Sequence, residues 1–243
     1  MNFFIEAFNT ILYAPLLNAL ILIYQYLPGR DFGIAIIVLT IIIRIIMSPL
    51  MASSIKSQKI MSELQPKIQE IQQKFKDDKE KQARETMALY QKEKINPFGG
   101  CLPLLVQLPI LIALYQVFWN GFQEKAMVHL YSFVANPGVS FHPAFLGIVD
   151  MTKPFLILAL LAGATQFIQT KMITPKAKNN QNGKKTTGQF SDMMQKQMLY
   201  FFPLFTVFIL WTLPSAVALY WTTNNLFSIL QQYLIFKPRT QKV

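Results

Sequence analysis

One permanently charged side chain lies inside a run of apolar residues. Arg44 is the only charged residue of Phe32–Leu50, FGIAIIVLTIIIRIIMSPL. A run of about nineteen residues is long enough to cross a bilayer core as a helix. A charge at that depth costs roughly 2.5–3.5 kcal/mol on insertion scales. The Arg44 guanidinium therefore either extends to the cytoplasmic headgroups or faces a hydrated cavity built by other spans.

Neutral hydrogen-bonding side chains recur in the same run and in three other apolar runs. Thr40 precedes Arg44 by four residues and shares its helix face. The other candidates for such a cavity are Gln107, Gln166, Gln169, Trp221, Thr222 and Asn225. Gln107 has a second interpretation, as a hydrogen-bond partner between helices. Because the predicted spans contain no acidic partner for Arg44, we expect a groove that attracts acidic or polar segments of another chain.

Patterns typical of catalysis and metal binding are missing from the sequence. It contains no Gly-x-Ser-x-Gly, His-Glu-x-x-His or phosphate-binding loop. The single cysteine, Cys101, excludes an intramolecular disulfide, and no Cys–His cluster offers a metal site. His129 and His142 fall in one loop and are expected to be solvated. We therefore expect no enzyme activity and no cofactor.

The composition indicates a membrane protein with several spans. Of 243 residues, 52% are hydrophobic, and the mean hydropathy is +0.31. The predicted spans are residues 32–51, 98–119, 154–170, 198–213 and 215–236. The third would give roughly 25 Å of helix, less than the ~30 Å hydrocarbon core, and the fourth is similarly short. Two short neighbouring spans should thin the bilayer or bring water into it.

Basic residues are concentrated in three segments between and after these spans. Residues 52–96 carry a net charge of +3, residues 171–197 carry +5, and the tail 237–243 carries +3. The positive-inside rule places these segments in the cytoplasm, so that the N-terminus lies outside and the C-terminus inside. This basic excess is either an orientation signal alone or a surface for anionic lipids and ribosomal RNA.

Residues 1–31 are predicted to form a separate N-terminal element. Residues 1–27 are apolar but are interrupted by polar side chains that share one helical face: Asn2, Glu6, Asn9, Thr10 and Tyr13. This pattern favours an amphipathic helix in the membrane interface, and an uncleaved sixth span is the alternative. No basic residue precedes residue 30, and no cysteine lies near the N-terminus, so we expect neither a signal peptide nor a lipid anchor.

The segment after the first span is predicted to be a helical hairpin, at about 55–95. We expect the first span to end at Ser48-Pro49. Apolar residues then recur at helical spacing: Ile60, Leu64, Ile68, Ile71 and Phe75. Asp77–Lys79 is a predicted turn before a second helix over 80–94. The hairpin is either a solvated spacer or a mobile arm that receives substrate.

The linker at about 174–191 is predicted to be disordered.

Four motifs resemble one family, the YidC/Oxa/Alb membrane protein insertases. They are TIIIRIIMSPL, NPFGGCLPLLVQLPILIALYQVFW, QFIQTKM and LPSAVALYWTTNNLFSILQQ. The resemblance covers about residues 1–236. It implies five core helices around a hydrophilic groove that is open to cytoplasm and lipid and closed to the outside. It also implies that Arg44 is the groove arginine, that Thr40 lies beside it, and that Trp221 contacts substrate. The hairpin corresponds to the family's mobile arm, and residues 1–27 to its interfacial helix.

The chain departs from this family in three respects. The large external domain of some relatives and the lipoprotein signal of others are missing. The tail after Phe236 is short, so ribosome docking through a long basic tail is not expected. The run LPSAV differs from the more usual PSG form, which should affect only a helix bend.

Together these observations predict an all-α polytopic membrane protein with five transmembrane helices around a hydrophilic groove. Residues 32–236 form the insertase core, and 237–243 a basic tail. We expect a monomer in the bacterial cytoplasmic membrane whose clients are nascent membrane proteins and whose other partner is the bilayer. Ribosome and Sec translocon contacts are left open. The alternatives are a solute channel or transporter, which predicts internal repeats, and an assembly chaperone that inserts nothing.

Overall fold

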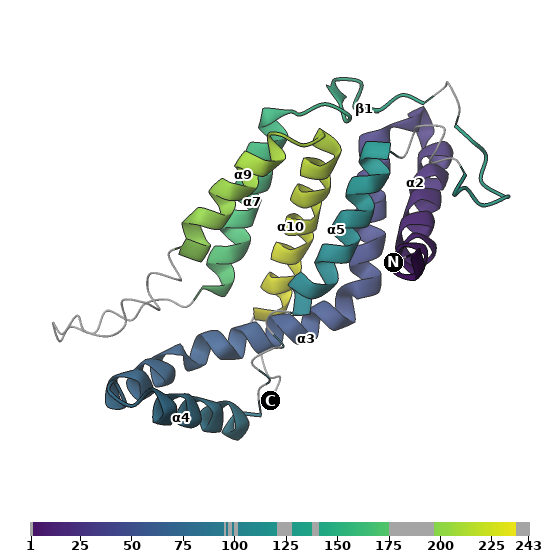
Figure 1. Cartoon of the computed structure of the whole chain (residues 1–243). Coiled ribbons are helices and arrows are strands. Elements are labelled where there is room, and N and C mark those ends of the chain that lie inside the picture. The colour runs from purple at the N-terminus through teal and green to yellow at the C-terminus, as the bar shows by residue number, and fades with distance from the viewer. Residues whose placement is uncertain are drawn as a thin grey trace, which may run out of the picture.

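The computed structural model is mainly helical (Figure 1). It describes residues 2–94, 96, 99, 102–120, 128–137, 141–174 and 197–236. The predicted linker, apart from Thr174, and the predicted tail 237–243 lie outside these residues.

Three helical stretches of the described chain are long and apolar enough to cross a membrane. They are Phe3–Tyr26, Phe32–Lys74 and Leu156–Ile173. Two shorter apolar helices occupy Leu105–Trp119 and Gln197–Leu210. The last helix, α10 (Ser215–Phe236), has 22 residues, but it buries several amide and hydroxyl side chains that make it more polar. The count of five spans therefore stays a prediction.

Helix α3 runs without interruption from Phe32 to Lys74. The helix continues through Pro49 and Pro66, so the predicted end of the first span at Ser48-Pro49 lies inside a continuous helix, and the end of the span stays a prediction. A proline removes one backbone hydrogen bond and crowds the preceding turn, which can bend a helix without ending it. Figure 1 shows the second half of α3 turning away from the first.

The second half of α3 and helix α4 (Lys79–Lys92) form a hairpin with a small core of its own. Leu64 and Ile68 are buried against Leu89 and Tyr90. Burial also raises the pKa of the Tyr90 hydroxyl above its ordinary value. The turn comes close to the predicted one, and the second helix begins one residue earlier and ends two residues earlier than expected.

The N-terminal element consists of helix α1 (Asn2–Phe8), the π-helical segment η1 (Asn9–Tyr13) and helix α2 (Ala14–Tyr26). A short 3₁₀ turn, η2 (Pro28–Arg30), joins it to α3. α2 lies beside α3, and Leu17, a fully buried residue of α2, belongs to the main core (Figure 1). Whether the whole element lies in the interface or spans the bilayer stays a prediction.

Helix α10 lies at the centre of the bundle. It packs against α3 on one side and α7 (Leu156–Ile173) on the other. Helices α5 (Leu102–Asn120) and α9 (Phe202–Leu210) lie on opposite sides of α10 in Figure 1. The π-helical segment η5 (Gln197–Phe201) precedes α9. The bounds of α5, α7, α10 and the stretch of η5 and α9 agree with the predicted runs to within about four residues at each end, which is the usual uncertainty of such boundaries. Helix α3 instead continues well beyond its predicted run.

A β-hairpin ties together the ends of α3 and α10 that face the predicted exterior. Strands β1 (Ala144–Phe145) and β2 (Val149–Asp150) pair in antiparallel register. The Asp31 carboxylate caps α3 at the Ile34 N–H, 2.8 Å away, and also accepts the Leu146 N–H. The loop after β2 serves α10 in the same way, because the Lys153 carbonyl accepts the Ser215 N–H at 2.9 Å. Helix-terminal N–H groups that would otherwise lack partners are thus satisfied by this loop.

Helices α7 and α9 approach closely at Gly163. A Cβ atom added there would lie 2.3 Å from Val207 Cγ2 and 3.1 Å from the Pro203 carbonyl oxygen. The first contact can be relieved by a side-chain rotation, but the second is with the backbone. The close packing of α7 against α9 therefore depends on the absence of a side chain at position 163.

We expect Gly163→Val to destabilise the protein by about 1–3 kcal/mol, because overpacking forces helices apart. The measurement is thermal unfolding of the purified full chain in detergent. Ala164→Val is the matched control, since Ala164 is the exposed neighbour on the same helix. Val207→Ala in the Gly163→Val background should recover part of the loss. Equal midpoints for the two valine variants would contradict this packing.

Candidate functional site

The Arg44 side chain is directed at α10. Only 8% of Arg44 is exposed. Its Nη2 donates to the backbone carbonyl oxygen of Asn224 at 3.2 Å. Its guanidinium carbon lies 5.6 Å from the centroid of the Phe227 ring, within the range of a cation–π contact. The guanidinium thus lies against α10, and a hydrated cavity around it stays a prediction.

Several buried polar atoms near Arg44 and along α10 have no hydrogen-bond partner among the described residues. They are Arg44 Nε, Asn224 Oδ1, Gln231 Oε1 and Gln232 Oε1. A buried donor or acceptor left without a partner costs about 1–3 kcal/mol. In the described part of the chain the ion pairs do not include Arg44. One donor and three acceptors thus retain hydrogen-bonding capacity that a polar ligand can use.

Gln231 joins α10 to α3 one turn after Arg44. Its Nε2 donates to the Ser48 carbonyl oxygen at 3.0 Å and to Ser48 Oγ at 3.2 Å. Sequence reasoning noted that the last span is unusually polar but did not select Asn224 or Gln231 as site residues. The available signal was their separation of seven residues, which puts both on one helix face.

Besides Arg44 and Asn225, three predicted groove residues form hydrogen bonds between α10 and its neighbours. Gln107 of α5 donates to the Tyr220 hydroxyl. Trp221 Nε1 donates to Gln166 Oε1 of α7 at 3.0 Å. The alternative interpretation of Gln107, as an interhelical partner, thus describes its contact in this structure. Burial of these donors and acceptors requires such pairing.

The remaining predicted residues divide into three groups. Asn225 Nδ2 reaches α7, where it donates to Thr165 Oγ1 at 3.2 Å and to the Ala162 carbonyl oxygen at 3.3 Å. Thr40 and Thr222 are buried, and their hydroxyls donate to carbonyl oxygens of their own helices. Gln169 is half-buried on α7. Arg44, Trp221 and Asn225 thus form hydrogen bonds between α10 and a neighbouring helix. The hydroxyls of Thr40 and Thr222 bond within their own helices.

Two open cavities lie away from these residues. One of about 520 Å³ lies between the N-terminal element and residues 128–131, and one of about 400 Å³ is lined by Tyr24, Arg30 and Pro137 among others. The lining of these two cavities includes no predicted groove residue. In the described part of the chain, no group of three or more His, Cys, Asp or Glu side chains could hold a metal ion.

Comparisons with known proteins identify relatives across most of the chain. A family model described as 60Kd inner membrane protein matches residues 22–242. The membrane protein insertase YidC of Wigglesworthia glossinidia brevipalpis is 38% identical over 224 residues, which is 92% of this chain but 36% of that protein. YidC of Fusobacterium nucleatum subsp. nucleatum is 38% identical over 207 residues, which is 85% of this chain and 87% of the relative.

A solved structure has the same fold. The structure titled "Active YidC insertase crystal structure with the first transmembrane domain resolved" matches with a TM-score of 0.59 and 26% identity. The match covers 91% of this chain and 46% of the solved chain. The chain spans about a third of the length of several relatives and most of the length of the Fusobacterium protein. From the family model, the relatives and the shared fold together, this chain belongs to the 60Kd inner membrane protein family, that of the YidC membrane protein insertases.

Proposed function

We propose that this chain inserts segments of nascent membrane proteins into the lipid bilayer. Relatives named as membrane protein insertases support insertion as the function. The observation that carries the proposal is the burial of Arg44 against α10, where no carboxylate of the described residues forms an ion pair with it. A guanidinium held in this way is a binding group for an acidic or polar segment of another chain.

The client enters from the cytoplasm into a groove walled by the five predicted spans. Because only 8% of Arg44 is exposed, its contact with the Asn224 carbonyl must loosen before a client carboxylate can bind. The unpartnered amide oxygens of Asn224, Gln231 and Gln232 accept client N–H groups or bridging water. Thr40, Trp221 and Asn225 line the same region in this proposal, and so do Gln107, Gln166, Gln169 and Thr222.

Lipid partitioning drives release in this proposal. An apolar client segment gains roughly 25 cal/mol for each Å² of apolar surface that leaves water, so no cofactor or nucleotide is needed. Short third and fourth spans lower the barrier in this proposal. The described residues of η5 and α9, Gln197–Leu210, account for roughly 21 Å of helix at 1.5 Å per residue. A thinner or wetter bilayer beside α7 and α9 shortens the distance that a polar segment crosses.

The topology that fits this function is five crossings of the bacterial cytoplasmic membrane, with the N-terminus outside and the C-terminus inside. The basic segments 52–96, 171–197 and 237–243 support this orientation. In the same scheme residues 1–31 lie in the outer interface, and the hairpin of α3 and α4 receives clients in the cytoplasm. Contacts with the ribosome would then involve the hairpin or the basic linker.

Arg44→Ala should reduce insertion of a client with an acidic translocated tail by about tenfold, the loss expected for one charge-assisted hydrogen bond. The measurement is protease protection of the client in proteoliposomes. Arg30→Ala is the matched control, because Arg30 is an exposed arginine outside both the proposed groove and the hairpin. A client with a neutral tail should be affected less. Equal insertion by the two alanine variants would show that the Arg44 charge has no role.

A photoreactive residue at position 44 or 221 should crosslink to a stalled client, because both positions line the proposed groove, one from α3 and one from α10. Ile46 provides the control position, since it is 72% exposed and lies on another face of α3. The measurement is the yield of crosslinked client on a gel. A yield at position 46 that matches the yields at 44 and 221 would argue against a groove and for general contact with the bundle surface.

A further inference from the structure

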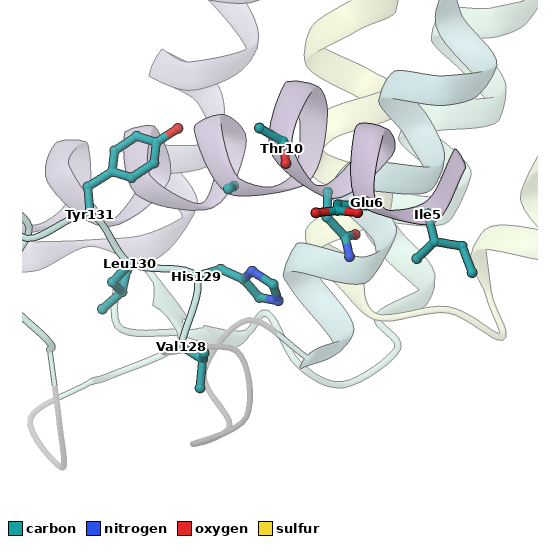
Figure 2. A pocket seen from close by; sticks show the side chains of 9 residues that line it. Ile5, Glu6, Thr10, Val128, His129, Leu130 and Tyr131 are labelled. Carbon is teal, nitrogen blue, oxygen red and sulfur yellow. The ribbon is translucent and has the colours of Figure 1, made fainter. Parts of the chain in front are cut away.

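A cavity of about 520 Å³ separates the N-terminal element from the loop at residues 128–131. Figure 2 shows Glu6 and Thr10 extending from the helix and His129 from the loop. Asn9 lines the same cavity, and its apolar wall includes Ile5 and Val128. The proposed insertion reaction does not use these residues, so the cavity is a separate feature of the molecule.

Buried contacts hold the two walls of this cavity in place. Asn18 of α2 is 1% exposed, and its Nδ2 donates to the His129 carbonyl oxygen at 2.9 Å. Its Oδ1 accepts the Tyr131 N–H at 2.8 Å. The His129 ring meets the Tyr13 ring edge to face, with centroids 5.4 Å apart. The loop is therefore fixed against the helix by specific contacts, and the cavity is a constant part of the fold.

The helix wall of the cavity has an irregular backbone. Asn9 and Thr10 belong to the π-helical segment η1, which directly precedes α2. π-helical turns in otherwise regular helices are frequent at functional sites. Pro15 lies at the start of α2 and lacks the N–H that a regular turn would donate back to η1. The wider turn directs two polar side chains to the cavity that already contains the Glu6 carboxylate.

The lining combines one negative charge with neutral polar groups and an apolar wall. With histidine counted as neutral, Glu6 is the only charged residue of the lining. The ion pairs of the described residues do not include Glu6. The Asn9 amide and Thr10 hydroxyl add acceptors and donors. Ile5 and Val128 are 55% and 82% exposed, so apolar surface remains available beside the carboxylate.

A ligand that suits this lining has a cationic hydrogen-bond donor attached to an apolar body. The helix that carries Glu6 lies within Phe3–Tyr26, which is apolar enough to enter a membrane. An exposed carboxylate on such a helix is costly near hydrocarbon unless a cation accompanies it. We propose that the cavity binds the headgroup of a lipid with a primary ammonium group, that the Glu6 carboxylate accepts its N–H donors, and that Ile5 and Val128 contact its apolar part.

The test is native mass spectrometry of the full chain released from vesicles of phosphatidylethanolamine, phosphatidylcholine and phosphatidylglycerol in equal amounts. We expect about fivefold more retained phosphatidylethanolamine than phosphatidylcholine, because a quaternary ammonium has no N–H to donate. Soluble phosphoethanolamine should not displace the lipid at equal concentration, since it lacks the apolar part. Equal retention of the two zwitterionic lipids, or displacement by phosphoethanolamine, would overturn the proposal.

Variants then assign the binding to Glu6. Glu6→Gln should lower phosphatidylethanolamine retention about fivefold, whereas Glu63→Gln should leave it unchanged. Glu63 is an exposed glutamate of the hairpin, so this control removes the same charge away from the cavity. Unchanged retention by Glu6→Gln, or an equal loss in both variants, would refute the assignment. The headgroup comparison on the unaltered chain decides the question if Glu6→Gln fails to fold.

Discussion

The burial of one guanidinium against one helix is the constraint on which the rest of the bundle depends. Arg44 is a permanent cation in an apolar run, so another helix must offer it polar groups at the same depth. Helix α10 supplies the Asn224 carbonyl and the Phe227 ring. A helix of Leu and Ile at this place would still offer a backbone carbonyl but would lack the Phe227 ring that lies over the guanidinium.

The polar face of α10 also connects the bundle in other directions. Trp221 and Asn225 bind α7, and Tyr220 accepts the Gln107 amide of α5. At the end that faces the predicted exterior, the loop after β2 satisfies the first N–H groups of α10. Hydrogen bonds in a medium of low dielectric constant are strong and directional. These hydrogen bonds fix the positions of α5, α7 and α10 relative to one another. Apolar contacts alone would not do so, because lipid chains offer similar contacts on every side.

Sequence patterns predicted the bounds of most helices better than they predicted which side chains contact one another. The run after Pro214 has the bounds of α10 because an apolar segment between a proline and a basic tail is unambiguous. The continuation of one helix through Pro49 was less evident, because a proline in the sequence is compatible with a helix end and with a bend. The side toward which Arg44 points depends on where α10 packs, which no local pattern encodes. Asn18 illustrates the same limit, since its partners are more than a hundred residues away.

The continuity of α3 has a mechanical consequence. One continuous but bent helix carries Arg44 in its first half and the buried Ile68 of the hairpin in its second half (Figure 1). Pro49 lies between these two residues and has no backbone N–H to donate, so the turn before it lacks one helical hydrogen bond. A movement of the hairpin would therefore reach the Arg44–Asn224 contact only through this weakened turn.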